Sequence, residues 1–97
     1  MQRDFNDEFT QKLYQAMLAL KTEEECAMFF EDILTISEIK AMAQRLEVAK
    51  YLQQHAVYSE IVKKTGASTA TISRVSRCLN YGSGGYQMVL DRLKEES

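Results

Sequence analysis

A glycine at position 66 separates two short segments with helical apolar spacing, and this arrangement constrains the fold more than any other feature. Ile61 and Val62 give the first segment an inward face, and Ile72 and Val75 give one to the second. A glycine just past a helix end adopts positive φ without steric cost, so the next helix can leave at a steep angle. The sequence therefore predicts a helix-turn-helix over residues 57–79.

The outward residues of the second helix are small at its N-terminal end and basic further along. Small hydroxyl and methyl side chains let a helix end enter a DNA major groove, and arginines reach guanine or phosphate. Lysines at the end of the first helix would contact neighbouring phosphates. The candidate DNA-binding residues are Lys63, Lys64, Ser68, Thr69, Ala70, Thr71, Ser73, Arg74 and Arg77. The alternative interpretation is a surface helical hairpin whose charges are simply solvated.

Charge is divided unevenly along the chain. The net charge of −2, taken alone, argues against a nucleic-acid binder. Residues 1–39, however, carry 3 basic and 9 acidic side chains, residues 40–80 carry 7 and 2, and residues 81–97 carry 2 and 3. The positive charge is thus gathered on and just before the predicted helix-turn-helix, where DNA phosphates would lie.

Composition predicts an all-α fold in a single domain, residues 1–97. Proline is absent, glycine occurs four times, and residues that favour helices dominate. We expect helices over Asn6–Leu20, from a cap at Thr22 to about Leu34, over Ser37–Gln54, and a closing helix over 84–95. The fragments T-E-E-E (22–25) and T-I-S-E (35–38) are capping boxes. The first helix is apolar on two faces, which indicates contact with something else. The third is also apolar on two faces, so we expect it to be buried between partners as the central helix of the fold.

Two connecting regions carry further predictions. His55 is expected in a turn or cap, and Val57 is a poor N-cap for the helix that follows it. Residues 80–85 are rich in glycine but lack the lysine and hydroxyl residue of a phosphate-binding P-loop, so we expect a flexible linker there.

Several classes of protein are excluded by what the sequence lacks. No apolar stretch approaches the roughly 18 residues of a membrane span, and no export signal is visible, so we expect a cytoplasmic protein. Two cysteines and one histidine are too few for a disulfide framework or a metal site. No nucleophile has an evident base beside it and no cofactor motif is present, so we do not expect an enzyme.

The chain resembles the Trp-repressor superfamily, and most closely its YerC/YecD branch. The most specific pieces are Q-R-L-E-V-A-K at 44–50, T-G-A-S-T-A-T-I-S-R at 65–74 and G-Y-Q-M-V-L-D-R-L at 85–93. The resemblance implies a six-helix subunit in an intertwined homodimer, with residues 1–54 as the dimerisation helices. It also implies that two recognition helices, about one DNA turn apart, read a palindromic operator in double-stranded DNA.

The resemblance further implies a candidate effector site. In the Trp repressor a threonine and two arginines hold a bound tryptophan, and these residues fall on Thr35, Arg45 and Arg74. Val75 stands where the family has a glycine facing the indole, and Cys78 where it has a serine meeting the amino group. A branched side chain there would fill the pocket, so we expect a smaller corepressor or none in place of tryptophan.

Two functions follow as hypotheses. The first is a dimeric, sequence-specific DNA-binding transcriptional regulator, a repressor that competes with polymerase for a promoter. The alternative is a helical protein-interaction module that keeps the fold without specific DNA readout and binds a partner through its first two helices. The acidic N-terminal third is compatible with this alternative.

Overall fold

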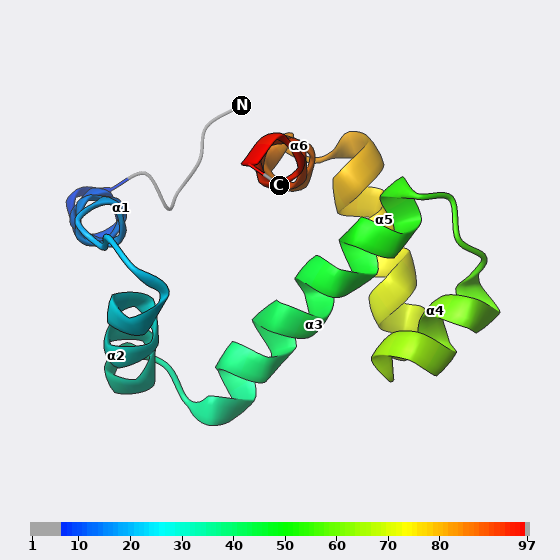
Figure 1. Ribbon diagram of the computed structural model, residues 1–97, viewed down its shortest axis with the longest axis horizontal. Coiled ribbons are helices and arrows are strands. Elements are labelled where there is room, and N and C mark those ends of the chain that lie inside the picture. The colour runs from blue at the N-terminus through cyan, green and yellow to red at the C-terminus, as the bar shows by residue number, and fades with distance from the viewer. Residues whose placement is uncertain (1–6, 97) are drawn as a thin grey trace. The chain divides into compact units, whose positions relative to one another are not determined.

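The computed structural model describes residues 7–96, which contain six α-helices and no strand. The helices are α1 (Glu8–Leu18), α2 (Glu23–Ile33), α3 (Ile36–Gln53), α4 (Tyr58–Thr65), α5 (Thr69–Tyr81) and α6 (Gly85–Glu96) (Figure 1). The all-α prediction is therefore confirmed over this range. The chain divides into two compact units, residues 1–39 and residues 40–97. Within the described range, no helix is both long enough and apolar enough to span a membrane.

The first helix of the first unit is capped by an aspartate. The Thr10 N–H donates to Asp7 Oδ1 at 2.8 Å. This hydrogen bond stabilises the ionised carboxylate and lowers the pKa of Asp7 below its ordinary value. α1 ends at Leu18, two residues before its predicted end, and the predicted start at Asn6 lies outside the described residues.

The two predicted capping boxes differ in how completely they form. At the start of α3, the Glu38 N–H donates to Thr35 Oγ1 at 3.1 Å and the Thr35 N–H donates to Glu38 Oε1 at 2.8 Å, so this box is reciprocal. At the start of α2, the Glu25 N–H donates to Thr22 Oγ1 at 3.0 Å. The Glu25 carboxylate, however, accepts from the Lys21 N–H, one residue before the expected donor.

The apolar side chains of α1 and α2 remain largely open to solvent. Neither helix contains a buried residue. Phe9 is 80% exposed, Leu18 is 85% exposed and Met28 is 65% exposed. The described part of the first unit therefore presents apolar surface of the kind that usually marks an interaction site.

The second unit has a compact core formed by part of α3 and by α4, α5 and α6. α5 packs against both α4 and α6. Ile61, Ile72 and Val75 are at most 1% exposed, which confirms their predicted inward orientation. The core consists of Val48, Ala49, Ile61, Ala67, Ile72, Val75 and Leu90. Full burial of each large aliphatic side chain stabilises the fold by about 1.5–3 kcal/mol relative to exposure.

The connection from α3 to α4 uses a left-handed residue. His55 has φ 64°, and the Ala56 N–H reaches back to the Tyr51 carbonyl oxygen at 3.0 Å, which closes the end of α3. The prediction that His55 lies in a turn is confirmed. Val57 precedes α4 without a side-chain capping hydrogen bond, as its side chain predicts.

The prediction of a linker over residues 80–85 is wrong about the length of the linker. α5 continues to Tyr81, past the predicted end at 79, and α6 begins at Gly85, so only residues 82–84 connect the two helices. The helix stops at Gly82, whose N–H donates to the Cys78 carbonyl oxygen at 2.8 Å. A Cβ at position 82 would lie 2.3 Å from that oxygen. Position 82 therefore requires glycine, and α5 continues as far as the residue before it.

Candidate nucleic-acid interface

The turn between α4 and α5 has the backbone geometry that the sequence predicts. Gly66 is left-handed, with φ 74°, and its N–H donates to the Val62 carbonyl oxygen at 2.9 Å. Ser68 is extended, and its hydroxyl oxygen accepts from the Thr71 N–H at 3.1 Å. The glycine and the serine therefore define where α4 ends and where α5 begins. We call residues 57–81 the α4–α5 segment.

A side chain from α3 also holds this turn. Gln44 Nε2 donates to the Thr65 carbonyl oxygen at 3.2 Å. The Thr65 hydroxyl donates to the Ile61 carbonyl oxygen at 2.7 Å and accepts from the Ala67 N–H at 3.1 Å. Sequence reasoning missed both roles. No helical periodicity shows that a polar side chain of α3 reaches a backbone group 21 residues further on. The Thr65 bonds are local and follow a known pattern of threonine side chains bonding nearby backbone groups, which was the available signal.

One face of α5 is exposed and carries small and basic side chains. Ala70, Ser73, Arg74 and Arg77 follow an i, i+3, i+4, i+7 spacing, and all four are exposed. The opposite side of the helix carries the buried Ile72 and Val75. The helix can therefore present these four side chains to a partner without loss of its own core contacts.

Positive charge is concentrated on the α4–α5 segment. The segment carries four basic side chains and one acidic side chain, a net charge of +3. Lys63 and Lys64 are exposed in the last turn of α4, where the helix dipole favours cations. Arg74 and Arg77 form no ion pair with any residue in the range 7–96. These cations are therefore accessible to an anionic partner.

The structure places eight of the nine predicted DNA-binding residues on the surface. The exposed ones are Lys63, Lys64, Ser68, Thr69, Ala70, Ser73, Arg74 and Arg77. Thr71 is half-buried, and its N–H and hydroxyl oxygen both bond to Ser68. Within this set Thr71 thus has a local role in starting α5.

The three candidate effector residues are distributed over both units. Thr35 belongs to the first unit, where its hydroxyl oxygen caps α3. Arg45 and Arg74 belong to the second unit, and both are exposed. Val75, which was expected to fill the ligand pocket of the family, is 1% exposed and lies in the core.

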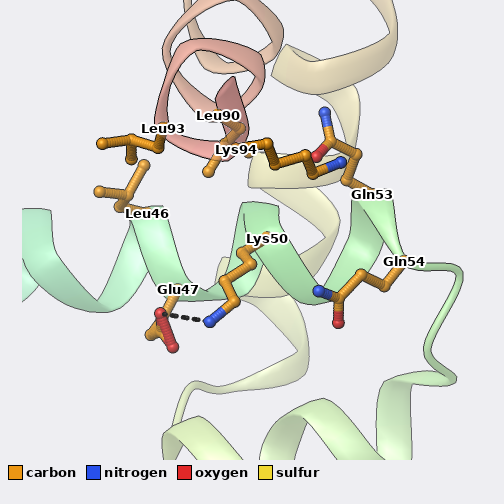
Figure 2. Close-up of a pocket in the computed structure, with 8 residues that line it drawn as sticks. All are labelled: Leu46, Glu47, Lys50, Gln53, Gln54, Leu90, Leu93 and Lys94. Atoms are coloured by element: carbon orange, nitrogen blue, oxygen red, sulfur yellow. Dashed lines mark ion pairs between the residues drawn. The ribbon is translucent and has the colours of Figure 1, made fainter. Parts of the chain in front are cut away.

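A groove lies between α3 and α6 in the second unit, with a volume of about 350 Å³ (Figure 2). It contains none of the candidate effector residues. Gln53 Nε2 donates to Asp91 Oδ1 at 3.4 Å, while Gln53 Oε1 is buried without a partner among the described residues. The lining residues are Leu46, Glu47, Lys50, Gln53, Gln54, Leu90, Leu93 and Lys94. The groove is therefore lined by three leucines together with charged and amide side chains.

Metal-ligating residues do not gather in the described part of the chain. No group of three or more histidine, cysteine, aspartate or glutamate side chains in residues 7–96 could hold an ion. Cys26 and Cys78 are free thiols.

Comparison with known proteins gives consistent matches over nearly the whole chain. Residues 8–94 match the family model described as Trp repressor protein. The Uncharacterized protein YerC of Bacillus subtilis (strain 168) is 57% identical over 84 residues, which are 87% of this chain and 81% of that protein.

Two solved structures are also similar. A TrpR like protein from Eubacterium eligens ATCC 27750 superposes with a TM-score of 0.91 at 52% identity, with 93% of each chain covered. A proposed Trp repressor from Staphylococcus aureus gives a TM-score of 0.91 at 42% identity, with 96% of each chain covered. The matches therefore extend over both compact units.

Proposed function

Because the chain belongs to the Trp repressor protein family, we propose that it is a dimeric, sequence-specific DNA-binding regulator. The family is one of regulators and not of enzymes, so the chain is not an enzyme. A DNA-binding regulator is what the family and the similar structures support. The operator, the dimer and the direction of regulation are parts of our proposal.

The exposed face of α5 is the observation that carries this proposal. Thr69 and Ala70 stand at the N-terminal end of α5, beside the Ser68 cap, and are small enough to approach base edges. Ser73 and Arg74 follow on the same side, and Arg74 can donate two hydrogen bonds to a guanine. In this proposal α4, the turn at residue 66 and α5 form the helix-turn-helix, with α5 in the major groove.

Phosphate contacts would come from three further basic residues. Lys63 and Lys64 lie in the last turn of α4, and Arg77 lies one turn beyond Ser73 on α5. Such contacts fix the orientation of a protein on DNA, and base contacts then provide the sequence preference. The net charge of +3 on the α4–α5 segment supports this division of roles.

A dimer would place two α5 helices on one duplex. The exposed apolar side chains of α1 and α2, including Phe9 and Leu18, support a second copy as their partner. A two-fold dimer reads a palindrome, with half-sites about ten base pairs apart. A regulator bound in this way at a promoter would exclude polymerase, so we propose repression.

A small-molecule effector site is a separate proposal, which does not depend on the DNA contacts. Thr35, Arg45 and Arg74 would hold a carboxylate, and arginine is well suited to this contact. We propose a smaller ligand than tryptophan, or none, because Val75 occupies the family's glycine position and is buried. Duplex binding that is unchanged by added tryptophan supports this view, and tryptophan-dependent binding would contradict it.

The salt dependence of binding to a random-sequence duplex pool tests the proposed interface. Log affinity falls with log salt, and each lost phosphate contact reduces the steepness of this fall by about 1. We expect this decrease for Lys63→Ala and no change for Arg92→Ala, an exposed arginine on α6 outside the segment. Equal slopes for Lys63→Ala and the wild type would contradict the assignment of Lys63.

A second candidate function is a protein-interaction module that uses α1 and α2. The exposure of Phe9, Leu18 and Met28 favours it as an alternative. The two functions differ in what they require of α5. If Thr69→Ala and Arg74→Ala leave the cellular phenotype of the wild type intact, the interaction module is favoured. If both variants abolish that phenotype, the DNA-binding regulator is favoured.

A further inference from the structure

The aromatic ring of Tyr51 lies beside two lysine ammonium groups. Lys64 Nζ is 5.8 Å from the ring centroid and Lys50 Nζ is 6.0 Å from it. A cation within about 6 Å of an aromatic centroid is attracted by the ring quadrupole. The structure therefore links the end of α3, where Tyr51 lies, to the last turn of α4, where Lys64 lies.

The backbone and the ring of Tyr51 are both held in place. The Tyr51 carbonyl oxygen accepts from the Gln54 N–H at 3.1 Å and from the Ala56 N–H at 3.0 Å. Its side chain is half-buried and packs against the core of the second unit. The ring thus forms a fixed platform for a side chain as mobile as lysine.

The two lysines differ in how their charge is balanced. Lys50 Nζ lies 3.8 Å from Glu47 Oε1, so a carboxylate offsets part of its charge (Figure 2). Lys64 has no carboxylate partner among residues 7–96. An aromatic ring holds an ammonium without cancelling its charge, whereas a carboxylate would hold it and neutralise it. Lys64 is therefore attracted to the ring while no carboxylate among the described residues offsets its charge.

Building on the proposed DNA-binding function, we propose that Tyr51 is a positioning residue that holds the Lys64 ammonium ready for a DNA phosphate. A free lysine loses rotamer freedom when a contact immobilises it, and this loss weakens binding. A lysine that is already restricted in the free protein loses less. Neighbouring Lys63 has no ring contact within residues 7–96 and serves as the matched comparison.

A double-mutant cycle on a random-sequence duplex pool at fixed salt tests this role. We expect Tyr51→Leu to weaken binding by about two- to fivefold, the range that a cation–π contact of this class gives. The same substitution should have no effect in a Lys64→Ala background and its full effect in a Lys63→Ala background. Tyr51→Phe keeps the ring and should bind as the wild type does.

The outcomes separate the positioning role from a structural one. An equal loss from Tyr51→Leu with and without Lys64 would overturn the proposal, because it would show that Tyr51 only supports the fold. Wild-type protein that binds no duplex would instead overturn the proposed function, and the phosphate role of Lys64 with it. If Tyr51→Leu does not fold, the proton shifts of the wild type decide. The Lys64 ε-methylene signal should show a ring-current shift that Lys63 lacks, and equal shifts would contradict the contact.

Discussion

Gln44 and Thr65 lie 21 residues apart in the chain and are joined by a hydrogen bond from the Gln44 side-chain amide to the Thr65 carbonyl oxygen, 3.2 Å long. Thr65 is the last residue of α4, and its carbonyl cannot be satisfied within that helix. The Gln44 side chain of α3 therefore supplies the hydrogen-bond donor that α4 itself cannot provide for its last carbonyl. The consequence is that α3 fixes the position at which the chain turns toward α5.

Replacement of Gln44 by methionine tests the value of this bond. The two side chains are similar in length, but methionine cannot donate to the Thr65 carbonyl. We expect the free energy of unfolding to fall by about 1 kcal/mol. Gln54→Met, at an exposed position just beyond α3, should change it by less than about 0.5 kcal/mol. Urea denaturation measures both, and equal stabilities would show that the bond contributes nothing.

Gly66 and Gly85 should respond in opposite ways to alanine. A Cβ at either position meets open space, but only Gly66 has a left-handed backbone, with φ +74°. Alanine at 66 should therefore lower stability by about 1–2 kcal/mol. Alanine at 85, in the first turn of α6, should raise stability by about 0.4–1 kcal/mol because it restricts the unfolded chain. Thermal unfolding that shifts both variants in the same direction would contradict this difference.

The two helices of the α4–α5 segment differ in their N-terminal capping. Substitutions can remove the cap of α5 and add one to α4. Ser68 caps α5 with its hydroxyl oxygen, whereas Val57 precedes α4 with the right backbone conformation and no capping group. Ser68→Ala should lower stability by about 1 kcal/mol, and Val57→Ser should raise it by a similar amount. Val57 is 65% exposed, so its replacement removes little buried surface. Urea denaturation of both variants measures these changes in stability. A loss of stability in Val57→Ser would contradict the predicted gain from a cap on α4.

Stability at acid pH should depend on Glu38. The hydrogen bond from the Thr35 N–H lowers the pKa of the Glu38 carboxyl from its ordinary value of 4.5. The stabilisation is therefore complete above pH 4.5 and is lost as the pH falls through the lower pKa of the folded state. Glu38→Gln keeps an acceptor but removes the titration, so its unfolding should depend less steeply on pH below 4.5. An acid limb identical to that of the wild type would show that this carboxylate does not contribute.

The proposed dimer should be sensitive to charge on the apolar surface of α1. Leu18 is 85% exposed in the single chain, and a carboxylate there would have to be buried at an interface between copies. We expect Leu18→Glu to be monomeric at concentrations at which the wild type is dimeric. Gln15→Glu adds the same charge at another exposed position of the same helix and should remain dimeric. Sedimentation equilibrium measures this, and a monomeric wild type would rule out the dimer.

Local patterns predicted most of the fold. The capping box at Thr35, the left-handed turn at Gly66 and the inward faces of α4 and α5 depend on residues close together in sequence, so their spacing contains the information. The bounds of α5 were less accurate. Asn80 and Tyr81 still belong to α5, because the helix ends only at Gly82. There the backbone lies so close to the Cys78 carbonyl oxygen that a side chain would not fit.

Contacts between distant helices were not predictable in the same way. The bond from Gln44 to Thr65 and the approach of Lys64 to the Tyr51 ring depend on how α3 packs against α4, which periodicity does not specify. The sequence did indicate which side of α5 is exposed, because one helix alone determines that face. Whether the candidate DNA-binding residues contact DNA stays a prediction.

Selection of bound duplexes from a random-sequence DNA pool, near physiological salt and without added ligand, tests the central proposal most directly. We expect enrichment of a palindrome whose half-sites lie about ten base pairs apart. We also expect Arg74→Ala to lose this enrichment and Arg92→Ala to keep it. A wild-type pool that stays unenriched, both alone and after addition of amino acids and cell extract, would contradict the assignment of this chain as a sequence-specific DNA-binding regulator.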